Sequence, residues 1–330
     1  MNKPFENLPV KATGDVQPDV AQALGLDDVV ARLRDARNAW RAATHRSPEM
    51  VERELPSVEA MADIVLGLQQ ALFPMRLGPS ALRTSDEDAY IARTLARVLG
   101  ALEDQVRLEQ AHQARLGLAV GEPQPPIAIV RDFAAQLPQM RVLLDSDVMA
   151  AFHGDPAARS VDEVLLAYPG IHAMIHHRIA HQLYRQGMTL LARLISEQSH
   201  GATGIDIHPG AQIGPGLFID HGTGVVIGET VIIGRNVRIY QAVTLGAKRF
   251  ASDENGHLVK GGARHPMLED DVVVYAGATI LGRVTIGRGS SIGGNVWLTR
   301  SVPPGSHIAQ ALARDCGKED DGLAVGNPCR

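Results

Sequence analysis

One histidine stands where an otherwise regular sequence repeat is interrupted. His221 lies in the segment Asp220-His221-Gly222-Thr223-Gly224. An imidazole near its ordinary pKa can remove a proton from a hydroxyl group at neutral pH, so His221 is a candidate general base. A carboxylate would hold the imidazole in one tautomer. Asp206 is favoured over Asp220 for this role, because adjacent side chains of an extended segment point to opposite faces. The alternative is a hydrogen-bonded surface histidine without a catalytic role.

The repeat around His221 has a period of six residues. After His200 an aliphatic residue returns at every sixth position, which is typical of a parallel β-helix built from hexapeptides. The thirteen aliphatic positions are Ile207, Ile213, Ile219, Ile227, Ile233, Ile239, Leu245, Leu268, Val274, Ile280, Ile286, Ile292 and Leu298. Each hexapeptide predicts one side of a three-sided coil with the aliphatic side chain inward.

Three places break the repeat, and stacked aliphatic side chains carry no chemistry, so functional residues are expected there. They are the start at Asp206–Pro209, the eight-residue step that contains His221, and an insertion over 246–265. Glycines stand near many of the aliphatic positions, where the chain must turn a corner.

The sequence before the repeats has helical periodicity. Apolar residues return every three or four positions up to about residue 200, and Ser160 with Glu163 forms a capping box that predicts a helix start. We therefore predict an α+β protein, with an α-helical domain over 27–200 followed by a left-handed parallel β-helix over 201–305 that carries the inserted loop 246–265. Residues 1–26 are predicted to be disordered and residues 306–330 to form a C-terminal tail.

Composition argues against several classes of function. The chain has 32 Lys and Arg against 37 Asp and Glu, so no excess of positive charge indicates a nucleic-acid or membrane partner. No apolar run approaches the roughly 18 residues of a membrane span, and the first residues lack the apolar stretch of a signal peptide, so we expect a cytoplasmic protein. Cys316 and Cys329 are expected to be surface thiols near the C-terminal end.

Five sequence blocks in order resemble the signature blocks of bacterial and plant serine O-acetyltransferases. The blocks are Asp206-Ile207-His208-Pro209-Gly210-Ala211, Asp220-His221-Gly222-Thr223-Gly224, Val226-Ile227-Gly228-Glu229-Thr230, Gln241-Ala242-Val243-Thr244-Leu245-Gly246 and Arg264-His265-Pro266. The resemblance covers roughly residues 145–304 and includes Gly154-Asp155-Pro156-Ala157 in the helical part.

The resemblance implies an enzyme that transfers the acetyl group of acetyl-CoA to L-serine, the first step of cysteine biosynthesis. By position, His221 would be the general base and Asp206 its orienting partner, with direct attack and no acyl-enzyme. Asp155 and Asp220 would hold the serine ammonium group. Arg264 and His265 would hold the carboxylate, since a guanidinium can bind a carboxylate through two parallel hydrogen bonds.

For acetyl-CoA, the resemblance implies a groove between adjacent β-helices of a homotrimer, or of a dimer of trimers. Ala247, Ala276 and Gly294 would line the path of the pantetheine arm. Ser291 stands where some relatives carry a lysine near the nucleotide phosphates. Lys248, Arg249 and Lys260 of the insertion could supply the positive charge instead, although charged loop residues are more often only solvated.

No metal is expected. His172, His176, His177 and His181 share one predicted helix, but no carboxylate or cysteine completes a ligand set. The chain ends in Arg330, whereas many relatives end in an isoleucine that enters cysteine synthase, so we expect no such complex through the C-terminus.

Three other functions compete with that of a serine acetyltransferase. Another hexapeptide acyltransferase, acting on a sugar or an amine, would leave Asp155 and Arg264 without a zwitterionic partner. A non-catalytic scaffold would be expected to lack His221 or Asp206, and both are present. A zinc hydratase on the same fold would need three converging histidines, which the spacing of His208, His221 and His265 does not specify.

Overall fold

A computed structural model of the chain describes residues 22–43, 55–118, 121–122, 124–248 and 261–310. The chain divides into two compact units, 1–54 and 55–330. The first unit contains helix α2 (Leu26–Ala43), of which no residue is buried. The predictions for Arg249, Lys260 and the C-terminal residues 311–330 lie outside the described residues.

The second unit begins with helices, which run three residues past the predicted end of the helical domain. They are α3 (Val58–Leu72), α4 (Pro74–Leu77), the 3-10 helix η1 (Thr84–Asp86), α5 (Glu87–Arg115), α6 (Pro126–Ala135), α7 (Leu137–Gly154), α8 (Val161–Ala167), α9 (Pro169–Arg185) and α10 (Thr189–Thr203). The Ser160 hydroxyl accepts the Glu163 backbone N–H at 3.0 Å, which confirms the predicted start of α8. Among the described residues, no helix is both long and apolar enough to cross a membrane.

Short parallel strands follow the helices, as predicted for the fold class. They are β1 (Asp206–Ile207), β2 (Gln212–Ile213), β3 (Phe218–Ile219), β4 (Val226–Ile227), β5 (Ile232–Ile233), β6 (Arg238–Ile239), β7 (Thr244–Gly246), β8 (Met267–Leu268), β9 (Val273–Val274), β10 (Thr279–Leu281), β11 (Thr285–Ile286), β12 (Ser291–Ile292), β13 (Trp297–Leu298) and β14 (His307–Ile308). The last strand, β14, lies beyond residue 305, where the tail was expected to begin.

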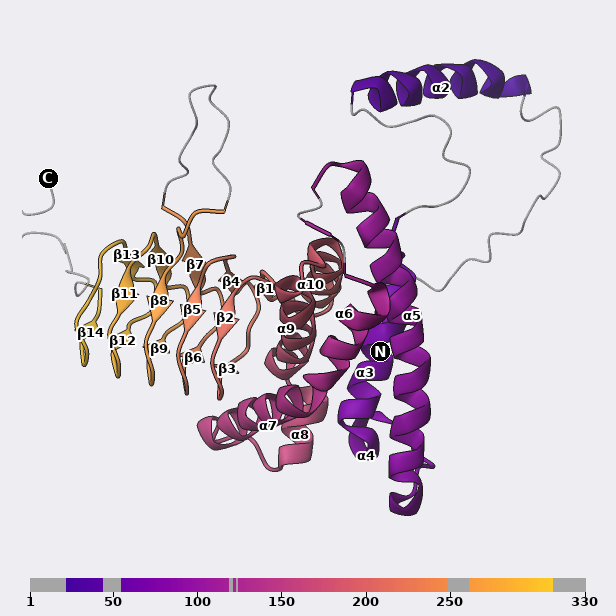
Figure 1. The fold of residues 1–330 in the computed structure, drawn as a ribbon. Coiled ribbons are helices and arrows are strands. Elements are labelled where there is room, and N and C mark those ends of the chain that lie inside the picture. The colour runs from indigo at the N-terminus through magenta and orange to yellow at the C-terminus, as the bar shows by residue number, and fades with distance from the viewer. Residues whose placement is uncertain (1–21, 44–54, 119–120, 123, 249–260, 311–330) are drawn as a thin grey trace, which may run out of the picture. The chain divides into compact units, whose positions relative to one another are not determined.

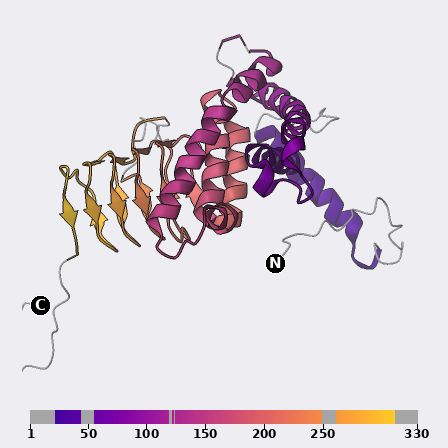
Figure 2. The same ribbon diagram turned by 90° about the horizontal axis from the view of Figure 1, so that it is seen from below.

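The strands form the three sides of a left-handed β-helix. Face A has the order β1-β4-β7-β10-β13, face B has β2-β5-β8-β11, and face C has β3-β6-β9-β12-β14. Each coil runs through faces A, B and C in turn, so the chain crosses an A–B, a B–C and a C–A corner. In both views the strands stack away from the helices of this unit (Figure 1, Figure 2).

Two inward residues per side fill the core. Twelve of the thirteen predicted aliphatic positions are buried, and Ile213 is partly buried. A second inward residue stands two positions before each of them, as Ile205, Val225 and Val243 do, and the sequence analysis missed this row. Both rows stack from coil to coil, because the register pairs each aliphatic residue with its equivalent, for example Ile227 with Leu245.

Polar side chains of α7 and α9 cover the open end of the first coil. Arg178 and Asp147 form a buried ion pair with N···O distances of 2.7 and 2.8 Å. The Arg178 guanidinium also donates to the carbonyls of Ile213 (3.3 Å) and Gly214 (3.0 Å). The Asp147 carboxylate accepts the N–H groups of Gly216 and Leu217. This terminal cap, Asp147 with Arg178, satisfies backbone groups that would otherwise form an unpaired edge.

Candidate active site

His221 projects from a strained turn at the C–A corner after β3. The Gly222 N–H donates to the Asp220 carbonyl at 2.7 Å, and His221 between them has φ +60°. This is a γ-turn of the rare form with a positive central φ, which a non-glycine residue adopts only against strain. The His221 side chain is 69% exposed. Backbone strain at an exposed histidine is typical of functional positions.

Asp155 lies directly after α7 and is held by two hydrogen bonds. The Tyr168 hydroxyl donates to Oδ2 at 2.5 Å, and the Ala157 N–H donates to Oδ1 at 2.8 Å. These bonds, the Tyr168 bond first, lower the pKa of Asp155 below its usual range, with smaller effects from the charges of His221 and Arg238. The same bond raises the pKa of Tyr168 to about 12. Asp155 is therefore a carboxylate close to the proposed base.

Asp220, which the sequence did not favour as the partner of His221, has its carboxylate near the imidazole. Asp220 Oδ1 lies 3.8 Å from His221 Nδ1, beyond hydrogen-bond reach. Asp206 begins β1 on face A, and among the described residues no hydrogen bond joins it to His221. Asp155, Tyr168, Asp220 and His221 thus form one group, named the C–A half-site from here on. The orienting role of Asp206 remains a prediction.

Arg264 and His265 lie on a different corner of the β-helix, just before β8. Arg264 Nη2 binds Glu229 Oε2 at 2.5 Å, and the Tyr184 hydroxyl donates to Glu229 Oε1 at 2.9 Å. Burial alone would raise the pKa of Glu229, but these two hydrogen bonds, together with the charges of His208 and Arg264, outweigh it and lower the pKa. Glu229 is therefore a carboxylate that fixes the Arg264 guanidinium. Glu229 lies in the block Val226-Ile227-Gly228-Glu229-Thr230, but the sequence alone predicted no role for it.

His265 is buried and neutral. Its side chain is enclosed, with 7% of the residue exposed, and burial followed by the Arg264 charge lowers its pKa to about 4. The Thr230 N–H donates to His265 Nδ1 at 3.1 Å, which leaves the proton on Nε2. Gly228 makes room for the ring, since an added Cβ would lie 2.3 Å from Nε2. Arg264 and His265 form the A–B half-site.

The two half-sites cannot grip one amino acid within a single chain. The C–A half-site follows β3, whereas the A–B half-site precedes β8, so the full width of face A separates the two corners. A side of about six residues spans roughly 15–20 Å. The ammonium and carboxylate groups of an amino acid are only about 3 Å apart. One chain therefore offers two complementary halves on opposite edges of face A.

Three of the four residues assigned to acetyl-CoA lie on the edges of face A. Ala276 and Gly294 are neighbours at the C–A corner of successive coils, since the Asn295 N–H donates to the Ala276 carbonyl at 2.9 Å. Ala247 follows β7 at the A–B corner, together with Lys248. Ser291 lies on face C, where its hydroxyl is 2.7 Å from His307 Nδ1.

The four histidines of α9 are buried or partly buried in the protein interior. Burial lowers the pKa of His172, His176, His177 and His181, the pKa of His176 to about 4. His181 Nδ1 lies 2.8 Å from the Pro209 carbonyl and His176 Nδ1 2.9 Å from the His172 carbonyl. Within the described part of the chain, no three His, Cys, Asp or Glu side chains are arranged to hold a metal ion.

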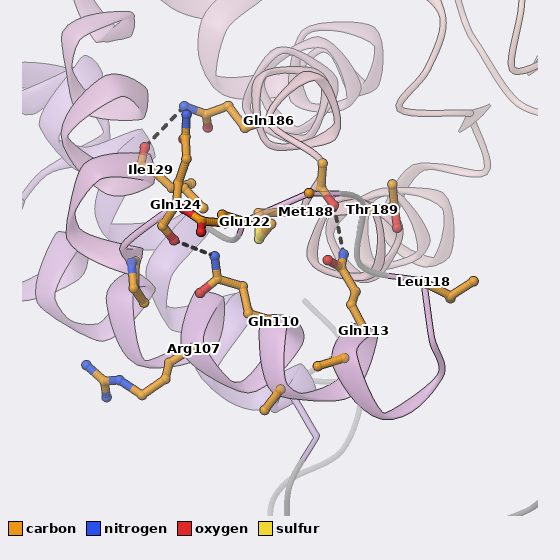
Figure 3. Close-up of a pocket in the computed structure, with 15 residues that line it drawn as sticks. Arg107, Gln110, Gln113, Leu118, Glu122, Gln124, Ile129, Gln186, Met188 and Thr189 are labelled. Atoms are coloured by element: carbon orange, nitrogen blue, oxygen red, sulfur yellow. Dashed lines mark hydrogen bonds between the residues drawn. The ribbon is translucent and has the colours of Figure 1, made fainter.

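A cavity of about 760 Å³ lies in the helical part, between α5, α6 and the turn from α9 to α10 (Figure 3). Three of its glutamine side chains donate hydrogen bonds to backbone carbonyls of lining residues. Gln110 donates to the Gln124 carbonyl, Gln113 to the Gly187 carbonyl and Gln186 to the Ile129 carbonyl. Its described lining contains no histidine or cysteine, whereas each half-site contains a histidine.

A match to a family model identifies the class of protein. Residues 265–300 match the family model described as bacterial transferase hexapeptide (six repeats). The fold and this match define a hexapeptide-repeat transferase.

Whole-chain relatives identify the family. The protein named "Serine acetyltransferase, plasmid" of Synechococcus elongatus is 50% identical over 316 residues, which are 92% of this chain and 96% of that relative. Serine acetyltransferase 1 of Entamoeba histolytica, solved in complex with L-cysteine, has a TM-score of 0.66 at 37% identity, covering 75% of this chain and 86% of that one. Isoform 3 of the same organism, also solved with cysteine, has a TM-score of 0.62 at 33% identity, covering 78% and 84%. The chain belongs to the serine acetyltransferase family, and it is an acyltransferase.

Proposed function

We propose that the protein transfers the acetyl group of acetyl-CoA to the hydroxyl of L-serine, with His221 as the general base. The observation that carries the proposal is the C–A half-site, where an exposed imidazole on a strained turn stands beside two acidic residues. The L-cysteine bound by a similar protein supports an amino acid as the ligand, because cysteine is nearly isosteric with serine. The product would be O-acetyl-L-serine, a precursor of cysteine.

The chemistry follows from the residues of the half-site. His221 accepts the proton of the serine hydroxyl as the oxygen attacks the thioester carbon, and the C–O bond forms. The resulting tetrahedral intermediate breaks its C–S bond, and the imidazolium returns the proton to the departing CoA sulfur. Asp155 and Asp220 hold the serine ammonium group, which has three donors. Asp206 remains our candidate for orienting the imidazole.

A second copy of the chain would complete the site. Arg264 is already held by Glu229, and its remaining N–H donors can bind the serine carboxylate together with His265 Nε2. Because the two half-sites lie on opposite edges of face A, the A–B corner of one protomer must meet the C–A corner of the next. A head-to-tail contact closes into a ring when its rotation returns to the first protomer, and we propose that three protomers close the ring as a homotrimer.

The outward side of face A fits that interface. Its outward column is Asp206, Val226, Thr244, Thr279 and Trp297, as the strand register shows. Asp206 is the sole charged member of the column, and Trp297 is 70% exposed in the single chain. A weakly charged surface with an exposed tryptophan is typical of the core of a protein interface. Ala276 and Gly294 of one protomer and Ala247 of the next would line the acetyl-CoA groove, with Ser291 toward the phosphates.

The direct test is thiol release from acetyl-CoA in the presence of L-serine. We expect the wild-type protein to release CoA only when serine is added, and His221→Ala to lower kcat by roughly 10²- to 10⁴-fold. The matched control is His153→Ala, an exposed histidine one residue before the end of α7. Wild-type turnover of a sugar or amine in preference to serine would overturn the substrate, and full activity of His221→Ala would overturn the base.

A further inference from the structure

Two tyrosines stack along the C–A corner below the proposed base. The rings of Tyr240 and Tyr275 are nearly parallel, with centroids 5.3 Å apart and an interplanar angle of 11°. The register of face C explains this arrangement, because β3, β6, β9 and β12 pair in order through Ile219, Ile239, Val274 and Ile292. The residues that follow these four are Asp220, Tyr240, Tyr275 and Gly293, so they form one column.

The column leaves one face of Tyr275 open. Tyr240 covers the ring on the side toward Asp220, and the position on the other side is Gly293, which has no side chain. Gly294 follows it, so neither residue of this coil places a side chain beside the ring, and the next side chain of the column is that of Ala309, beyond Gly293. Tyr275 is 45% exposed, and among the described residues Tyr240 is the only ring recorded against it. A planar group could stack on this open face.

The place of Tyr275 along the corner indicates which group would stack. Tyr275 directly precedes Ala276, on the proposed path of the pantetheine arm. It lies two coils below the coil that carries His221, and coils are spaced by about 4.8 Å, so the distance along the corner is roughly 10 Å. In an extended pantetheine arm the second amide, counted from the sulfur, lies about 9 Å from the thioester sulfur.

We propose that Tyr275 is a positioning residue for the acyl donor, on whose open ring face the second pantetheine amide stacks. The inference rests on the proposed function, since it takes acetyl-CoA as the donor. Tyr240 supports Tyr275 from behind, and Arg238 in turn donates to the Tyr240 hydroxyl at 3.4 Å. The stack would hold the arm in register, so that the thioester reaches His221.

The test uses three acetyl donors of decreasing length. Acetyl-CoA and acetyl-pantetheine contain both amides, whereas S-acetyl-N-acetylcysteamine contains only the first. We expect Tyr275→Ala to raise KM for the two longer donors by about 3- to 10-fold, as the loss of one aromatic contact would, with KM for serine unchanged. The wild-type preference for acetyl-pantetheine over the cysteamine thioester should shrink by the same factor. Tyr275→Phe should keep the preference, and Tyr275→Leu should lose it, because leucine has bulk but no flat ring.

The outcomes separate this inference from the proposed function. If wild-type protein does not acetylate serine, the proposed function fails first. If it does, but Tyr275→Ala treats the longer donors as the wild type does, the stacking inference is wrong. A loss confined to acetyl-CoA would assign the contact to the nucleotide and overturn the amide assignment. An equal loss with all three donors would also overturn it. Thermal unfolding of each variant checks that the fold is intact.

Discussion

At the scale of single residues, the γ-turn at His221 sets the direction of the imidazole. Ala242 and Asn295 at the C–A corners of later coils have positive φ as well, but at His221 the positive φ lies inside the tight turn closed by the Gly222 N–H and the Asp220 carbonyl. Gly222 is the partner that permits this turn. It has φ +83°, and an added Cβ would lie 2.4 Å from Ile205 Cδ1, a side chain buried in the first coil.

The turn can be tested with two glycines of the same step. Gly222→Ala combines an unfavourable φ with a clash, so we expect a loss of about 2–4 kcal/mol in the free energy of unfolding and a large loss of acetyltransferase activity. Gly224 has φ +76°, but its added Cβ would meet nothing closer than 3.6 Å. Gly224→Ala should lose only about 1 kcal/mol. Denaturant titration of both variants gives the comparison, and equal losses would contradict the clash.

At the scale of secondary structure, the terminal cap joins α7 and α9 to the first coil. Buried ion pairs can often be replaced by apolar residues with little loss of stability. This pair is different, because Arg178 and Asp147 also bind four backbone groups of the first coil. Replacement of both side chains would leave three of those groups unpaired, since only the Gly216 N–H has a second acceptor, the Ser146 hydroxyl at 3.0 Å.

The cap therefore predicts an unusual double-mutant result. Arg178→Met should lower the free energy of unfolding by about 3–5 kcal/mol, since it leaves Asp147 as an unpaired buried charge. Asp147→Leu combined with Arg178→Met should remain destabilised by several kcal/mol, because the backbone groups stay unsatisfied. Urea unfolding of the single and double variants measures both values. A double variant as stable as the wild type would show that the backbone bonds add nothing.

Helix α9 also predicts how stability depends on pH. Burial lowers the pKa of His176 to about 4, so the unfolded chain, with a histidine pKa near 6.5, binds more protons in acid. The stability linked to His176 is fully present above pH 6.5 and falls as the pH drops toward 4, by about 2 kcal/mol at pH 5. His176→Gln should flatten the decline in unfolding free energy between pH 7.5 and pH 5. The exposed His153, changed to Gln, is the matched control and should leave the slope as it is.

The sequence predicted the helices and strands better than the contacts between them. The six-residue period predicted the three-sided coil, because one aliphatic row is visible in any linear reading. The second inward row, which begins at Ile205, was missed because Ala211, Pro266 and Ser290 interrupt its run of aliphatic residues. The repeat count could also have assigned each site residue to a corner of the coil, because His221 follows the third side of one coil and Arg264 precedes the second side of another. The pairing of Arg264 with Glu229 could not, because it joins successive coils across an insertion.

At the scale of the whole molecule, the separation of the half-sites predicts complementation between inactive variants. His221→Ala destroys one half-site and Arg264→Ala the other, so each protein alone should be inactive. In mixed trimers, a protomer with intact His221 can meet a neighbour with intact Arg264. Random assembly in equal amounts gives about one quarter of the sites both intact halves. Co-expression followed by the thiol-release assay measures the recovery, and no recovery would place both halves in one chain.

The terminal cap has a consequence for how the coils are numbered. The hexapeptide coils have similar patterns. If all strands were shifted by one whole coil relative to the helices, both aliphatic rows would still be buried. The carbonyls of Ile213 and Gly214 and the N–H groups of Gly216 and Leu217 can meet Arg178 and Asp147 in one alignment only. The helices thus mark the origin from which the coils are counted. That origin keeps the irregular eight-residue step beside Asp155, so the repetitive sequence places His221, and not another residue of the repeat, next to that carboxylate.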